Sequence, residues 1–131
     1  MAKEVLFKGK SEEELKKVKM EDFMKIITSR ARRSLKRGFS EQQKKLLLKI
    51  KKVNEGKYKK IIKTHCRDIV ILPEMIGLTI HVYTGKEYVP VVVSHEMIGS
   101  YLGEFTMTRK KVQHSAPGIG ATKSSGALSV K

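Results

Sequence analysis

Apolar residues in the first half of the chain recur every three or four positions, which is the period of an amphipathic helix. The stretch Ser11-Glu-Glu-Glu14 fits a capping box, in which a hydroxyl and a carboxylate three residues later satisfy the first backbone N–H groups. A short helix is therefore expected over residues 12–18. A longer helical stripe follows and is expected to end before Gly38, because glycine readily adopts the left-handed conformation of a helix end. Its apolar positions are Met20, Phe23, Met24, Ile27, Ala31 and Leu35.

A second capping box, Ser40-Glu-Gln-Gln43, predicts a further helix that ends at Asn54-Glu55-Gly56. Its apolar positions lie on one face, and several lysines, Lys44 among them, occupy the rest of the surface. The apolar positions are Leu46, Leu47, Ile50 and Val53.

Beyond Lys63 the apolar pattern changes to the alternation and β-branched runs of strands. Residues 68–72 form such a run and stop at Pro73, while residues 78–82 and 89–93 alternate and flank a tight turn at Gly85. We expect a small antiparallel sheet of three strands. Pro90 cannot donate a ladder hydrogen bond, so it is expected to face outward on an edge strand or to lie at a bulge. Its buried face is predicted to consist of Leu78, Ile80, Val82, Val89, Val91 and Val93.

The fold class predicted from these elements is α+β: basic N-terminal helices, then the small antiparallel sheet, then an extended C-terminal tail. The tail from Arg109 contains Pro117-Gly-Ile-Gly-Ala-Thr-Lys-Ser-Ser-Gly126 and almost no large apolar side chains. It cannot bury enough surface to offset the entropy of ordering it, so we expect only a partner to fix it.

The charge of the chain is high and unevenly placed. The formal net charge is +15; residues 1–63 carry 21 Lys and Arg against 8 Asp and Glu, and residues 64–131 carry 7 against 5. Such a charge destabilises a compact chain unless a polyanion neutralises it, and nucleic acid is the favoured polyanion because each neutralised phosphate releases counterions. Residues 23–40 contain no acidic residue, so the cluster Arg30, Arg32, Arg33, Lys36 and Arg37 is predicted to contact phosphates.

Several other classes of function are disfavoured. No apolar run approaches the roughly 20 residues that cross a bilayer, and the N-terminus has no signal-peptide core. The one cysteine, Cys66, cannot form an intramolecular disulfide, which fits a reducing, cytoplasmic setting. The four histidines have no zinc-ligand spacing, and we find no catalytic arrangement of side chains. We therefore expect no metal, no cofactor, no small-molecule substrate and no enzymatic activity.

Residues 84–108 carry the most specific pattern. It runs Thr84-Gly85-Lys86, six residues, Val93, four residues, Ile98-Gly99, two residues, Leu102-Gly103-Glu104-Phe105, two residues, Thr108. This pattern resembles the signature of the S-nineteen family of small-subunit ribosomal proteins, the S-fifteen proteins of eukaryotes. The helical extension over residues 1–35 and the tail Pro117–Ser125 resemble the archaeal and eukaryotic branch.

The resemblance implies three parts: a basic helical extension over residues 1–35, an S-nineteen-like α+β domain over residues 36–108, and a flexible tail over residues 109–131. It implies a structural protein of the small ribosomal subunit that binds ribosomal RNA in the subunit head, beside a protein of the S-thirteen family. The RNA contacts expected on this basis are Arg30, Arg32, Arg33, Lys36, Arg37, Lys44, Arg67, Lys86, Arg109, Lys110 and Lys111.

The resemblance also implies that the tail reaches the tRNAs near the decoding region. The tail residues expected there are His114, Pro117, Gly118, Gly120, Thr122 and Lys123. Two alternatives stay open at this point. A chromatin-like, sequence-tolerant DNA-binding protein would share the charge without needing the signature, and a small RNA-acting enzyme would need a reactive site.

Overall fold

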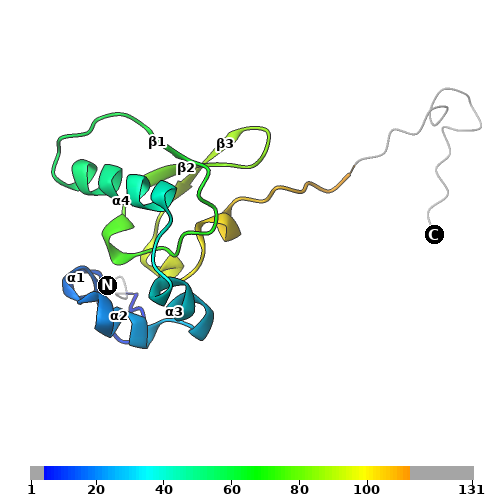
Figure 1. Ribbon diagram of the computed structural model, residues 1–131. Coiled ribbons are helices and arrows are strands. Elements are labelled where there is room, and N and C mark those ends of the chain that lie inside the picture. Colours follow the sequence, from blue (N-terminus) through cyan, green and yellow to red (C-terminus); the bar gives the residue numbers. More distant parts are fainter. Residues whose placement is uncertain (1–4, 113–131) are drawn as a thin grey trace, which may run out of the picture.

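The computed structural model describes residues 5–112, which form four α-helices, three strands and three short 3-10 turns. In Figure 1, helices α1, α2 and α3 gather at one end of the molecule, and α4 lies beside the sheet. The α-helices are α1 (Glu12–Lys17), α2 (Met20–Ile26), α3 (Ser29–Lys36) and α4 (Glu41–Asn54). The strands are β1 (Ile62–Thr64), β2 (Thr79–Tyr83) and β3 (Tyr88–Val92), and the turns are η1 (Pro73–Met75), η2 (His95–Met97) and η3 (Leu102–Phe105).

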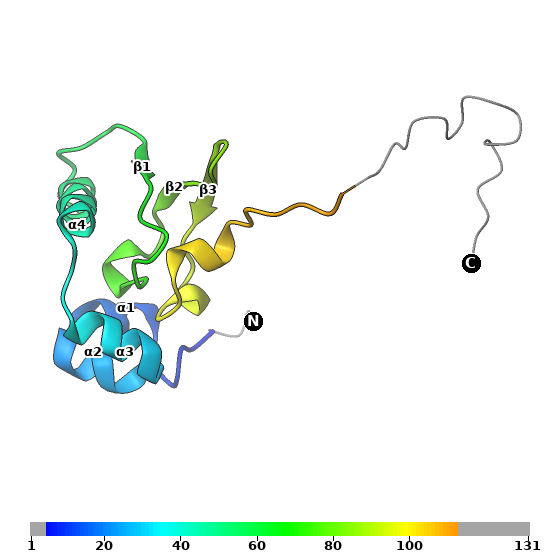
Figure 2. The ribbon, with the colours of Figure 1, turned by 45° about the vertical axis from the view of Figure 1, so that its right-hand side comes forward.

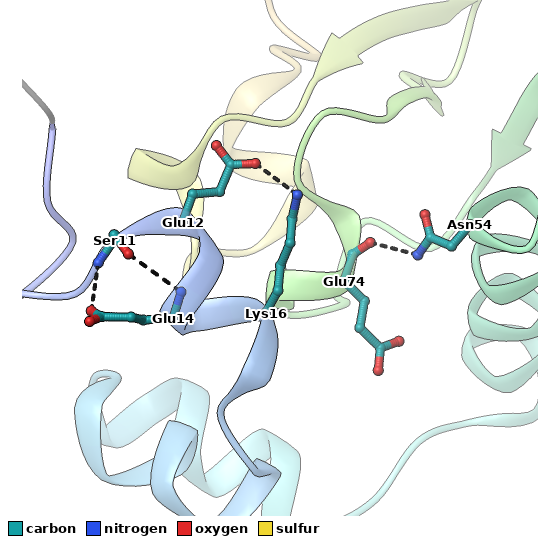
Figure 3. Close-up of polar contacts among 6 residues, drawn as sticks. All are labelled: Ser11, Glu12, Glu14, Lys16, Asn54 and Glu74. Carbon is teal, nitrogen blue, oxygen red and sulfur yellow. Dashed lines mark hydrogen bonds and ion pairs between the residues drawn. The ribbon is translucent and has the colours of Figure 1, made fainter.

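Both predicted capping boxes are present. The Ser11 and Ser40 side chains accept from the backbone N–H groups of Glu14 and Gln43, and the side chains of those residues accept in return from the N-cap N–H groups. Figure 3 shows the first of these boxes at the start of α1. Local sequence therefore sets where α1 and α4 begin.

The helical stripe from Met20 to Leu35 forms two helices rather than the single one expected. Between α2 and α3 the backbone is extended at Ile27 and Thr28. The three residues Ile26, Ile27 and Thr28 are all β-branched, which restricts the side-chain rotamers that a helix allows. The break turns α3 against α2, so that Phe23, Ile27 and Ala31 are all buried.

The prediction of an antiparallel sheet is correct for two strands and wrong for the third. β2 and β3 form the expected antiparallel hairpin, with Ile80 opposite Val91 and Gly85 at φ +97° in the turn. The third strand is β1, which pairs with β2 in parallel, so the sheet is mixed with the order β1-β2-β3. Pro90 lies exposed on the edge strand β3, as its missing N–H requires.

Residues 68–72, predicted as a strand, form instead one side of an irregular pairing with residues 99–103. Ile71 bonds through its N–H to the Ser100 carbonyl (2.8 Å) and through its carbonyl to the Gly99 N–H (3.1 Å). Only Val70 and Tyr101 make a β-bridge. Beyond that bridge the partner segment turns into η3, and the N–H groups of Leu102 and Gly103 donate to the carbonyl oxygens of Ile69 (3.0 Å) and Arg67 (2.9 Å). We call residues 67–71 and 99–103 the paired segments.

One hydrophobic core joins the N-terminal helices to the rest of the fold. Leu15, Phe23, Ile27 and Ala31 belong to the same buried cluster as Ile80 of β2. Helices α1, α2 and α3 are therefore packed into the same fold as the sheet. The central buried residues outside the N-terminal helices are Leu46, Ile50, Ile62, Ile69, Val70, Ile71, Leu72, Met75, Val82, Val91, Val93, Ile98 and Leu102.

One polar contact fastens α4 to η1. At the end of α4, the Asn54 side-chain amide donates to the Glu74 carbonyl oxygen (3.0 Å), a contact drawn in Figure 3 beside the Lys16–Glu12 ion pair of α1. Helix α1 packs on the same turn. The chain then leaves the body of the protein after Phe105 as an extended segment, drawn in orange in Figure 2.

Candidate nucleic-acid interface

Helix α3 presents four of the predicted phosphate-binding cations to solvent. Arg30, Arg33, Lys36 and Arg37 are all exposed. None of them forms an ion pair with any residue between 5 and 112. Cations at this density without internal partners leave their charge available to an outside polyanion. This face of α3 is the strongest candidate for binding phosphates.

The fifth cation of this cluster, Arg32, is engaged inside the protein. Its guanidinium donates to three carbonyl oxygens at the end of α2, those of Met24 (2.7 Å), Lys25 (3.4 Å) and Ile27 (3.2 Å). The last carbonyls of a helix have no partner within the helix, so these bonds cap α2. This role could not be predicted from the sequence, because the acceptors are backbone carbonyls, which no side-chain pattern marks.

Arg67 is also engaged inside the protein, at the paired segments. Its guanidinium donates to the carbonyl oxygens of Tyr83 (3.1 Å), Gly103 (2.9 Å) and Thr106, and to the Thr106 hydroxyl (2.7 Å). These four bonds tie the end of β2 to η3 and to the start of the extended segment. The RNA contact expected of Arg67 stays a prediction, and most of its donors already have partners.

Two glycines of the signature are explained by close contacts. A Cβ atom on Gly103 would lie 2.9 Å from both the Cβ and the carbonyl oxygen of Arg67. Gly99 has φ +81°, and a Cβ there would lie 3.0 Å from Cγ2 of Ile27. Side chains at these positions would push residues 99–103 away from Arg67 and from Ile27 of the helical extension.

The remaining predicted cations are exposed and lie on three different elements. Lys44 is on α4, Lys86 is at the tip of the β2–β3 hairpin, and Arg109, Lys110 and Lys111 lie within the extended segment. Lys110 lies 3.8 Å from Glu87, so the hairpin tip and the extended segment are neighbours. Lys86 and residues 109–111 can therefore present one joint basic surface. The predicted tail residues His114, Pro117, Gly118, Gly120, Thr122 and Lys123 lie outside the described residues.

Among residues 5–112, the carboxylates that form ion pairs do so with lysines. The Glu12 carboxylate has a pKa below its ordinary value, because Lys16 donates a hydrogen bond to it and adds a positive charge 2.8 Å away. This shift belongs to an exposed ion pair on a helix. Within residues 5–112 there is no group of three His, Cys, Asp or Glu side chains placed to hold a metal ion. Nor is any helix in that range long and apolar enough to cross a membrane.

The comparisons with known proteins agree on one family. A family model described as Ribosomal protein S19 matches residues 33–114. The chain is 54% identical over 126 residues to the Small ribosomal subunit protein uS19 of Saccharolobus solfataricus, an alignment that covers 95% of this chain and 90% of that protein. The range matched by the family model includes the whole signature at residues 84–108. The chain belongs to the Ribosomal protein S19 family, whose members are structural proteins of the small ribosomal subunit.

Proposed function

We propose that this protein binds ribosomal RNA in the head of the small subunit through the exposed cations of α3, and through a second basic surface at the hairpin tip. The observation that carries the proposal is the face of α3, where Arg30, Arg33, Lys36 and Arg37 are exposed and have no acidic partner among the described residues. Helical RNA hides its base edges in a deep groove, so phosphates and 2′-hydroxyls are the targets these side chains can reach.

Within this proposal, Arg32 and Arg67 act indirectly. Arg32 fixes the angle between α2 and α3, and Arg67 fixes the hairpin relative to the extended segment. Both therefore hold the two basic surfaces in place. Lys44, Lys86, Arg109, Lys110 and Lys111 complete the proposed phosphate contacts.

The family resemblance adds two contacts to the proposal, one with a neighbouring protein and one with tRNA. A neighbour of the S-thirteen family would cover the exposed apolar side chains between residues 105 and 112. Phe105, Met107 and Val112 are 36%, 81% and 66% exposed. The tail from His114 to Lys123 would reach the tRNAs at the decoding region. The protein would act in the cytoplasm, on the ribosome, and without enzymatic activity.

The test compares two variants that lose the same charge. In one, the four cations of the α3 face become glutamine (Arg30, Arg33, Lys36 and Arg37→Gln). In the control, four exposed lysines that also have no ion-pair partner among the described residues become glutamine (Lys51, Lys52, Lys59 and Lys60→Gln). Filter binding to a transcript of the head domain of small-subunit ribosomal RNA is measured from 50 to 300 mM KCl. We expect the α3 variant to lose about 100-fold in affinity and its salt slope to fall by about 3, since each lost phosphate contact removes about 0.7–0.9 from the slope.

The control variant should lose less than about tenfold, through the general field alone. Equal losses in the two variants would show that binding follows net charge and not the face of α3. A wild-type preference for duplex DNA over the transcript would favour the chromatin-like alternative instead.

A further inference from the structure

Three aromatic side chains gather on the surface of the sheet, at the end where the hairpin turns. Tyr83 ends β2, Tyr88 begins β3 opposite it, and His65 directly follows β1. The ring centroid of His65 lies 4.4 Å from that of Tyr83 and 5.6 Å from that of Tyr88, and the two tyrosine centroids are 5.0 Å apart. We call these three residues the aromatic cluster.

Hydrogen bonds fix the orientation of these rings. The Tyr88 hydroxyl and His65 Nε2 are 2.9 Å apart, and the Tyr83 hydroxyl donates to the Gly85 carbonyl oxygen (3.0 Å). Both tyrosine hydroxyls and His65 Nε2 therefore have partners, while residue His65 is exposed. A ring held in this way loses little entropy when another ring stacks on it.

The cluster does not contribute to the hydrophobic core. The other two tyrosines, Tyr58 and Tyr101, pack against the buried residues of the core, whereas Tyr83 and Tyr88 do not. Packing of the core therefore leaves the position of the aromatic cluster unexplained.

A groove with a basic lining begins at the same histidine. It lies between α4 and β1, which Figure 1 shows side by side, and has a volume of about 230 Å³. Three lysines line it and no carboxylate does. The Lys63 Nζ atom also lies 5.3 Å from the centre of the Tyr88 ring, so this lysine belongs to both features. The lining residues are Gln42, Lys45, Leu46, Lys49, Lys63, Thr64, His65 and Cys66.

We propose that the aromatic cluster and the lysine groove together bind one unpaired nucleotide of the RNA, with its base stacked on the ring of the exposed residue His65 and its phosphate beside Lys45, Lys49 and Lys63. The inference rests on the proposed function and adds a subsite to it. Phosphates alone would need only the lysines, and an apolar partner would need no cations. A nucleotide carries both an aromatic face and a negative charge, and it matches the two adjoining surfaces.

The test uses two hairpin RNAs with identical stems. One carries a single bulged adenosine, and in the other the bulged nucleotide is abasic, so that only the stacking base differs. Fluorescence anisotropy with the full-length protein should give about tenfold tighter binding of the adenosine bulge, within the range measured for base–aromatic stacking. A 2-aminopurine at the bulge should lose fluorescence on binding.

Four variants locate the effect. His65→Ala, a change at an exposed position, should reduce the tenfold preference to below about twofold, and His65→Trp should restore it, because tryptophan offers a larger stacking face. Leu48→Ala is the control, since it removes an exposed apolar side chain of α4 outside the cluster and outside the groove lining, and it should keep the preference. A triple change of Lys45, Lys49 and Lys63→Gln should weaken binding of both hairpins by the same factor. Thermal unfolding of each variant verifies the fold.

Two results would overturn the inference: equal binding of the two hairpins by the wild-type protein, or an unchanged preference in His65→Ala. Either result leaves the proposed function intact if salt-dependent binding of the head-domain transcript persists. Failure to bind that transcript at all would defeat the proposed function, and the subsite with it.

Discussion

Helix α3 and the paired segments both contain arginine, and they use it in opposite ways. On α3, Arg30 and Arg33 are exposed and have no ion-pair partner among the described residues. At the paired segments, Arg67 donates all its observed hydrogen bonds to acceptors of the protein itself. The contrast shows that a basic residue in a basic protein has two possible uses, and only the positions of the acceptors decide between them.

The sharpest test of this contrast is Arg67→Met, which keeps most of the side-chain volume and removes every donor. The carbonyls of Tyr83, Gly103 and Thr106 would lose their charged partner, so we expect the free energy of unfolding to fall by about 3 kcal/mol. Urea unfolding measures the change. The matched control is Lys86→Met at the exposed hairpin tip, where the change should stay within about 0.5 kcal/mol. A stable Arg67→Met variant with weakened RNA binding would reverse the assignment of the two roles.

A smaller effect is expected from Arg32→Met, compared with Arg33→Met one residue away. Arg32 caps the end of α2, and its loss should cost about 1.5 kcal/mol of unfolding free energy with little direct effect on phosphate contacts. Arg33 is exposed, so its loss should leave stability within about 0.5 kcal/mol and lower RNA affinity several-fold. Chemical unfolding and filter binding of both variants separate the two roles. Matching effects of the two substitutions in both assays would contradict the contrast.

The smallest expected effect lies in the Glu12–Lys16 pair of α1. The hydrogen bond and the charge of Lys16 lower the pKa of Glu12 in the folded protein. A group with a lowered folded pKa stabilises the fold at pH values above its unfolded pKa, and loses that contribution as the pH falls through the folded pKa. The stability difference between the wild type and Lys16→Met should thus be present at pH 7 and disappear in strong acid. Because the pair is exposed, the difference should also shrink in high salt, and a difference that persists in acid would exclude this origin.

Features set by neighbouring residues could be predicted from the sequence. The capping boxes at Ser11 and Ser40, the end of α4 and the Gly85 hairpin all depend on contacts within a few positions, and all are present in the structure. The parallel pairing of β1 could not be predicted, since Ile62, Lys63 and Thr64 form a segment of only three residues and nothing in them indicates their partner strand. They become a strand by pairing with β2, 18 positions further along the chain at Ile80.

The internal roles of Arg32 and Arg67 were beyond the sequence for a related reason. Their acceptors are backbone carbonyls, which every residue has, so no side-chain pattern marks them. Thr106 lies 39 positions from Arg67, and only the fold brings it close. The aromatic cluster could not be predicted either, because His65 and Tyr88 are 23 positions apart and no local sequence pattern links them.

The contact of Gly99 with Ile27 has a consequence for the order of synthesis. Ile27 is made early, and the loop that covers it follows 72 residues later, while Tyr101, which bonds to Ser34, comes later still. At the ribosome that makes it, the basic N-terminal part must therefore emerge with its apolar stripe uncovered. Each new copy thus passes through a stage in which an apolar stripe and a strongly cationic segment are both exposed. This stage ends when residues 99–103 are synthesised and cover the stripe.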